Sequence, residues 1–306
     1  MQKAQVNKNL ILFLVLSVLM SEPIRAQTGD NVSIDDSRSS SNTALAWLDS
    51  VKGTAGSMHW PNVDPVLFFE NLRGFAISPL KFYEGRSNNF CAYTALTYLP
   101  LNNDAAAFIQ FMLKLYQDGE ATYHKVHFQP EKAVLEEAGL LKYKGALDLN
   151  PAAQMWFLSL ADHFKGYLNV INKHFDKGDE NTLWASTNFA KFNRMVRKVG
   201  GLKVKARGSD LIRPWINDLY GYIREKLNNG TVYLYLNNRL LYRKKHTVSR
   251  FSIPTHYILL LDIYQVSDDK INIVYWDYGM KSLQQVSPQF LKKIIFGITF
   301  AYPHEQ

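Results

Sequence analysis

The sequence of 306 residues contains one cysteine, Cys91, and this shortage excludes an intramolecular disulfide. Its 17 glycines and 11 prolines follow no period, so a fibrous protein is not expected. No repeat of solenoid or propeller length is visible. The sequence also lacks a P-loop and a dinucleotide-binding fingerprint. With 47% hydrophobic and 13% aromatic residues, it has too much apolar content for a disordered chain, and we expect a globular protein.

The N-terminus has the parts of a secretory signal peptide. Lys3 and Lys8 precede an apolar run from Leu10 to Met20, which has 11 residues, about half of the roughly 20 that a membrane-spanning helix needs. Ala26 suits signal peptidase cleavage. We therefore expect residues 1–26 to be removed, with no stable membrane anchor, and the protein to be secreted or periplasmic. Residues 27–44 are rich in Ser, Asp and Asn and predict a flexible leader.

The chain is moderately basic. Its formal charge of +8 falls to +6 when residues 1–26 are removed, because that segment contains three basic residues and one acidic residue. The basic runs are short: Arg194, Arg197 and Lys198 form one, and residues 243–245 form another. Nucleic-acid binding would need a concentrated basic face and a reading motif, so no nucleic-acid partner is expected. A solvated surface, or attraction to an anionic cell envelope, explains the charge.

The pattern along the chain predicts an α+β fold, with a helical N-terminal half packed on an antiparallel β-sheet from the C-terminal half. Residues 45–83 predict short elements and turns around three prolines. Helices are expected from Cys91 onward, from about 103 to 119, and at 129–140, 150–171, 181–199 and 209–227. Strands are expected at 231–236, 257–266, 271–277 and 296–302, with a helix at 287–295 before the last strand. Residues 45–306 then form a single domain.

Three residues lie at the ends of these elements, where a side chain is both rigidly held and accessible. Cys91 begins a helix, and the positive end of the helix dipole favours a thiolate there. His256 opens the strand YILLLDI, and Asp277 closes the strand VYWD. If these strands pair through a turn at 267–270, His256 and Asp277 meet at the open end of the hairpin. A carboxylate there orients the imidazole, whose other nitrogen faces the sulfur.

The order of these elements resembles that of the papain-like cysteine hydrolases, and within them the bacterial branch that includes the bacteriocin-processing (double-glycine) peptidases. The resemblance covers roughly residues 80–302. It is carried by Cys91 at a helix N-terminus, and by the segments RPWINDLYGYIREKLNNGTVYLYL, THYILLLDI, INIVYWDYG and SPQFLKKIIFGITFAY. It implies a papain-like fold with a helical insertion at about 100–230, and a catalytic triad of Cys91, His256 and Asp277.

One position departs from the family pattern. The family places an oxyanion-stabilising Gln about six residues before the cysteine, where this chain has Gly85. Asn88 or Asn89 would have to supply an amide donor together with the Cys91 backbone N–H. An inactive relative is therefore an alternative.

Other polar residues carry weaker signals. His124 and His127 have metal-ligand spacing without a third ligand nearby, so surface or packing roles are favoured and no metal or other cofactor is expected. Glu131, Glu136 and Glu137 predict a solvated helix face. Gly56-Ser57 lacks the context of a nucleophile elbow. The tyrosines of one series favour strand packing over a carbohydrate platform: Tyr233, Tyr235 and Tyr242.

The sequence thus predicts an exported cysteine peptidase or amidase, with a peptide or peptidoglycan-like substrate. Two alternatives stay open. One is an inactive papain-like protein that binds a ligand in the envelope, and the other is an amidase or acyl-transfer toxin. The oligomeric state and the bond specificity are not predicted, because groove residues carry no motif.

Overall fold

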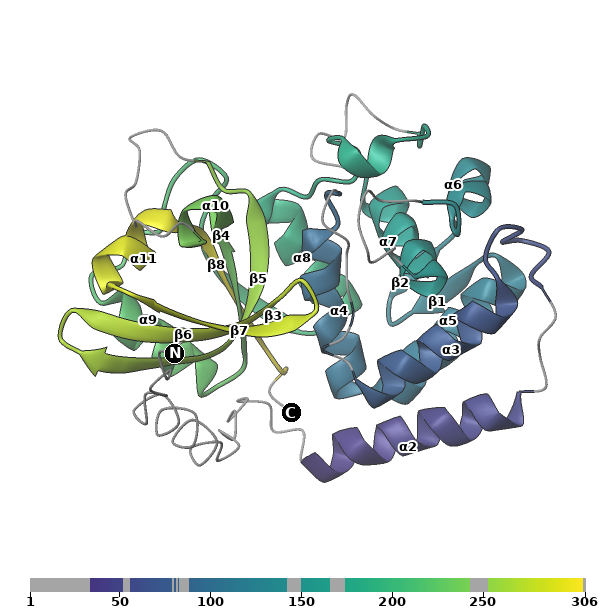
Figure 1. Ribbon diagram of the computed structural model, residues 1–306, viewed down its shortest axis with the longest axis horizontal. Helices are drawn as coiled ribbons and strands as arrows, with labels where there is room; N and C mark the ends of the chain where they lie inside the picture. Colours follow the sequence, from purple (N-terminus) through teal and green to yellow (C-terminus); the bar gives the residue numbers. More distant parts are fainter. Residues whose placement is uncertain are drawn as a thin grey trace, which may run out of the picture.

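A computed structural model describes residues 34–51, 56–78, 80, 82, 88–141, 150–165, 174–242 and 253–304. The expected signal peptide, Gly85 and the basic run 243–245 lie outside these ranges. The protein is α+β, with a helical lobe and a sheet lobe side by side (Figure 1). Helices α4 and α8 lie between the two lobes, where they join the helical half to the sheet.

The helices precede most of the sheet in the chain. Their bounds are α2 (Ile34–Ser50), α3 (Pro65–Ile77), α4 (Cys91–Asn103), α5 (Ala105–Asp118), α6 (Lys132–Glu137), α7 (Pro151–Phe164), α8 (Phe189–Val199), α9 (Leu219–Leu227), α10 (Asn238–Leu241) and α11 (Pro288–Ile294). A 3-10 turn, η2 (Asp179–Asn181), precedes α8.

The sheet lobe is built on six antiparallel strands in the order β3-β8-β4-β5-β6-β7. Their bounds are β3 (Lys203–Gly208), β4 (Thr231–Leu236), β5 (His256–Ser267), β6 (Lys270–Asp277), β7 (Met280–Val286) and β8 (Ile295–Tyr302). A separate hairpin of β1 (Ala121–Tyr123) and β2 (Val126–Phe128) belongs to the helical lobe.

Both faces of the sheet are covered, which explains why all six residues of β4 are buried. Tyr233 and Tyr235 face the core shared with the helical lobe. Val232 and Leu234 face a second core beneath α9 and α11. This alternation follows from the period of two along a strand. Apolar and aromatic side chains at every position after Thr231 therefore suit β4 to the centre of the sheet.

The strands that the sequence predicted are confirmed in β4, β5, β6 and β8, and the final helix is confirmed in α11. The helix expected from about 103 to 119 is α5, whose N-cap Asp104 accepts from Ala107 N at 2.9 Å. It ends at Gly119, which has a left-handed φ of 75°. Strands β3 and β7 were not predicted. Strand β3 is a mostly exposed edge strand, and its alternation of polar and apolar residues contains only two apolar side chains, Val204 and Ala206.

Several predicted helices are shorter in the structure. The helix expected at 209–227 is wrong in its first half, because α9 begins only at Leu219, with Asp218 as its N-cap. Pro214 disfavours helical backbone at Arg213, so residues 209–218 form a loop. Helix α8 likewise begins at Phe189, capped by Asn188, rather than at 181. Helices α6 and α7 cover only parts of the ranges 129–140 and 150–171.

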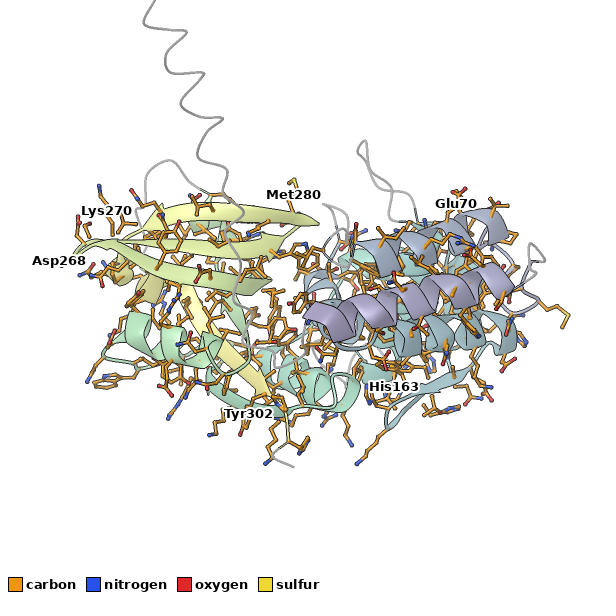
Figure 2. All side chains as sticks on the ribbon, turned by 90° about the horizontal axis from the view of Figure 1, so that it is seen from below. Glu70, His163, Asp268, Lys270, Met280 and Tyr302 are labelled. Atoms are coloured by element: carbon orange, nitrogen blue, oxygen red, sulfur yellow. The ribbon has the colours of Figure 1, made fainter. Side chains whose placement is uncertain are left out.

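The flexible leader predicted at 27–44 is wrong for residues 34–44, which form the first part of α2. Figure 2 shows α2 lying across the surface of the helical lobe. Ala44 and Leu48 are buried in the shared core, and the Ser40 hydroxyl donates to Asp104 Oδ1 at 3.0 Å. The low apolar content of its first half hid this helix, which the partly buried Leu45 and Trp47 also pack against the core. Helix α3 is also longer than the short elements expected there, with Asp64 as its cap.

Across the described part of the chain, no helix is both long enough and apolar enough to cross a membrane.

Candidate active site

Cys91 is the first residue of α4, at the boundary between the two lobes. Its side chain is partly exposed, and α4 packs on β5 of the sheet. The residue before it, Phe90, provides no side-chain cap, and the first hydrogen bond of the helix runs from Thr94 N to Phe90 O at 3.0 Å. The first N–H groups of a helix have no partner within the helix. The sulfur therefore lies beside backbone donors and the positive end of the helix dipole.

His256 is the first residue of β5, and it is buried with 4% of its surface exposed. Its Nε2 contacts Asp277 Oδ1, and the ring also forms a hydrogen bond with Cys91. Burial by itself lowers the pKa of His256. The negative charge of Cys91 and the hydrogen bond to Asp277 outweigh it, so the pKa is raised well above its usual value. Since Nε2 faces the carboxylate, Nδ1 is left for the sulfur.

Asp277 is the last residue of β6 and is also buried. Its Oδ1 contacts His256, and its Oδ2 accepts a hydrogen bond from the hydroxyl of Tyr242. Burial, and then the negative charge of Asp277, raise the pKa of Tyr242, so its hydroxyl stays protonated and donates. Both carboxylate oxygens thus have a partner, which holds the acid in one orientation.

The turn after Asp277 places a ring over the imidazole. Tyr278 and Gly279 both have a positive φ, of 49° and 72°, and they connect β6 to β7 as a two-residue hairpin turn. The Tyr278 ring stacks on His256 with its centroid 4.8 Å away and an angle of 22° between the planes. The Tyr278 hydroxyl accepts from Asn238 Nδ2 at 3.2 Å. The stacked Tyr278 ring restricts the rotation of the His256 ring.

A cavity of about 300 Å³ opens beside Cys91. The stacked rings of Tyr235 and Tyr257, 4.2 Å apart, form part of its wall. Leu183, Leu211 and Ile253 also line it, and each of them is exposed. The cavity gives a substrate access to the sulfur from solvent.

The structure thus brings together Cys91, His256 and Asp277. It gives Asn88 and Asn89 contacts that the sequence did not predict. Asn88 Oδ1 accepts from Phe90 N at 2.9 Å, and Asn89 Nδ2 donates to Thr182 O at 2.8 Å. Both contacts fix the segment that leads into α4. An oxyanion role for either asparagine stays a prediction.

Tyr242 and Tyr278 were missed as functional residues. Strand packing is confirmed for Tyr233 and Tyr235 but is wrong for Tyr242, which follows α10 and reaches Asp277. This contact joins residues 35 positions apart and has no local signal. Tyr278 had one signal, its position directly after Asp277 in a turn.

The weaker candidates have structural partners. Glu131, at the N-cap of α6, is half-buried and accepts from His174 Nδ1 at 2.9 Å. Glu136 is exposed and pairs with Lys132. His127 Nδ1 lies 3.1 Å from Thr122 Oγ1, and His124 lies in the β1–β2 turn. Among the residues placed by the structure, no group of three His, Cys, Asp or Glu side chains suits a metal ion. Ser57 hydrogen-bonds Tyr116 O.

No family model, curated protein or solved structure matches this chain.

Proposed function

We propose that the protein is a papain-like cysteine hydrolase that cleaves a peptide bond or another amide bond. One observation carries the proposal: Cys91, at the N-terminus of α4, hydrogen-bonds a buried histidine whose other nitrogen contacts Asp277. Cys91 is also accessible from a cavity. A structural cysteine needs neither the buried ion pair nor the opening to solvent.

The proposed reaction has two halves. The Cys91 thiolate attacks the carbonyl carbon and forms a C–S bond, while the Cys91 backbone N–H stabilises the oxyanion. The His256 imidazolium then gives its proton to the leaving nitrogen, and the C–N bond breaks. In the second half, His256 takes a proton from water and the resulting hydroxide attacks the thioester carbon. The C–S bond then breaks, Cys91 leaves as a thiolate beside the His256 imidazolium, and the carboxylic acid product is released. Asp277 orients the ring in both halves.

The first test is the reactivity of Cys91 toward iodoacetamide at neutral pH. Because Cys91 is the only cysteine, the intact mass reports its alkylation alone. We expect alkylation of the wild-type protein to be at least about tenfold faster than that of His256→Ala, since the variant loses the partner that stabilises the thiolate. The matched control is His127→Ala, which removes an exposed histidine of strand β2 in the helical lobe. Its Cys91 should react like that of the wild type.

Equal reactivity in the wild type and His256→Ala would contradict the proposal and favour the alternative of an inactive protein that binds a ligand in the envelope. If the thiol is reactive, hydrolysis of a peptide mixture and of purified peptidoglycan is measured next, with Cys91→Ser as the inactive control. Cleavage of peptidoglycan alone would favour the amidase toxin over the peptidase.

We also propose that the enzyme acts outside the cytoplasm, in the periplasm or after secretion. The composition of residues 1–26 supports this location, and so does the presence of a single cysteine, which leaves no second thiol for an unwanted disulfide within the chain.

A further inference from the structure

A second cavity, of about 890 Å³, lies in the helical lobe, and no residue lines both this cavity and the one beside Cys91. Seven of its nine lining residues are Lys, Arg or His, and none is Asp or Glu. The basic residues come from the β1–β2 hairpin, the end of α7, residue 174 and the outer face of α8. We call this feature the basic cavity. Figure 2 labels one of its residues, His163, at the edge of the helical lobe.

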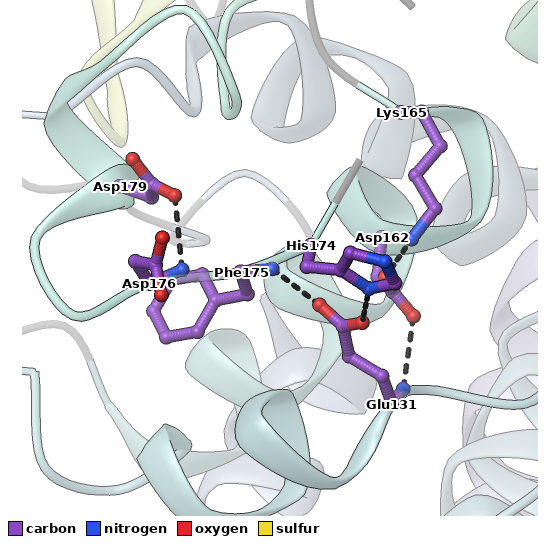
Figure 3. A network of polar contacts seen from close by, with 7 residues as sticks. All are labelled: Glu131, Asp162, Lys165, His174, Phe175, Asp176 and Asp179. Atoms are coloured by element: carbon purple, nitrogen blue, oxygen red, sulfur yellow. Dashed lines mark hydrogen bonds and ion pairs between the residues drawn. The ribbon is translucent and has the colours of Figure 1, made fainter. Parts of the chain in front are cut away.

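Three carboxylates contact residues that line the basic cavity: Asp162, Glu131 and the partly exposed Glu120, whose Oε2 lies 3.7 Å from His127 Nε2. Figure 3 shows that Asp162 contacts Lys165 and also accepts from Glu131 N, at 3.0 Å. Glu131 in turn accepts from His174 Nδ1 at 2.9 Å and from Phe175 N. The side chain of Asp162 is only 7% exposed. Asp162 and Glu131 thus hold Lys165 and His174 in position.

Three other cations line the basic cavity and have no ion pair within the described part of the chain. Lys125, Arg194 and Lys198 form no ion pair with any residue that the structure describes, and all three are exposed. Arg194 and Lys198 are one helical turn apart on α8, a spacing at which like charges repel. Such repulsion lowers stability, and an anion between the two side chains would remove it.

The positive charge of Arg194 also acts on the neighbouring Lys191. Its ammonium group contacts the carbonyl of Lys165, at the edge of the basic cavity. Burial, and then the positive charge of Arg194, lower the pKa of Lys191 to about 8. Arg194 is therefore near enough for its positive charge to act on Lys191, and it adds to the positive potential at this end of the basic cavity.

We propose that the basic cavity binds a small polyanion, a molecule that carries two or more phosphate or carboxylate groups. Its volume is within the range of small-molecule sites and exceeds that of one phosphate ion. Lys125 and the pair on α8 approach from different elements, so a ligand that contacts all of them needs more than one anionic group. Arg194 supplies a planar donor for bidentate contact with an oxyanion. The proposal does not depend on hydrolysis at Cys91.

The test is isothermal titration calorimetry of the full chain with tripolyphosphate, citrate and inorganic phosphate as probes. We expect tripolyphosphate to bind more tightly than inorganic phosphate. In the double variant Arg194→Ala/Lys198→Ala, affinity should fall at least about tenfold, because two charge-assisted contacts are lost. Comparison of tripolyphosphate with citrate decides between phosphate and carboxylate ligands.

The matched control is Lys292→Ala/Lys293→Ala, which removes two exposed cations from the last turn of α11. It should change the affinity less than about twofold, because general charge attraction at that distance is screened. Absence of tripolyphosphate binding to the wild type would overturn the proposal. An equal loss in both double variants would also overturn it, since binding would then follow net charge. Circular dichroism of each variant verifies that it is folded.

Discussion

At the scale of single residues, the charge state of His256 is decided by burial and by two neighbours, Cys91 and Asp277. Burial opposes the imidazolium, while Cys91 and Asp277 favour it, and the second influence is stronger. A raised pKa means that His256 is an imidazolium at every pH below the ordinary histidine pKa. The imidazolium also persists above that pKa, until the pH rises through the raised pKa of His256. The ring is thus expected to be charged at neutral pH. In the proposed reaction this proton goes to the leaving nitrogen.

The chemical shift of the His256 imidazole, followed by NMR against pH, tests this charge state. We expect a midpoint above 6.5 in the wild type, the ordinary value for histidine. Asp277→Asn should lower the midpoint, because the variant removes a negative charge that stabilises the imidazolium. Asp262→Asn is the control on the same sheet and should leave the midpoint unchanged, since Asp262 pairs with Arg224. A wild-type midpoint below 6.5 would show that burial prevails.

The three residues of the proposed triad could be singled out from the sequence because each one has a local signal. Cys91 begins a helix, His256 opens an apolar strand and Asp277 ends one. Tyr242 carries no such signal, because its role depends on a contact between α10 and the end of β6. The basic cavity was equally hidden, since Lys125 and Arg194 come together only after α7 and α8 pack.

At the scale of elements, the bounds of the four predicted strands were closer to the structure than the bounds of the predicted helices, although β1, β2, β3 and β7 were not predicted. The apolar patterns of β4, β5 and β6 are typical of strands. A strand buried on both faces is apolar at nearly every position, and a strand buried on one face is apolar at every second position. In 209–218, by contrast, Ile212 and Trp215 have helical spacing, but Pro214 lies between them. Both side chains are exposed in a loop. Periodicity therefore predicted a helix that the backbone of proline does not allow.

Helix α2 packs on α3 and α5 through the apolar side chains of its second half. Leu48 is 2% exposed and packs in the shared core, so Leu48→Ala should lower the free energy of unfolding by about 2–5 kcal/mol. Urea denaturation followed by circular dichroism measures this change. Asn42→Ala, on an exposed position of the same helix, should change it by less than about 0.5 kcal/mol. Equal effects of the two variants would mean that α2 is not docked.

At the scale of the whole molecule, the two lobes share a core. Trp156 of α7 and Trp276 of β6 belong to the same buried cluster, although they lie in different lobes. The two parts of the proposed active site, Cys91 and the His256–Asp277 pair, are joined through this core.

We therefore expect the two lobes to unfold together. Urea unfolding followed by far-UV circular dichroism and by tryptophan fluorescence should give one transition with the same midpoint, since opening either lobe exposes the common core. Two separated transitions would show that the lobes are independent, and would predict that alkylation of Cys91 loses its dependence on His256 at the first of them.

The opening beside Cys91 also exposes the sulfur to oxidants. Peroxide converts an accessible thiolate to a sulfenic acid, which many proteins rescue by forming a disulfide with a neighbouring thiol. This molecule has no second cysteine for that step. Recovery of an oxidised Cys91 therefore requires a small thiol or a reductase from its surroundings, and without one the oxidation proceeds to the irreversible sulfinic acid.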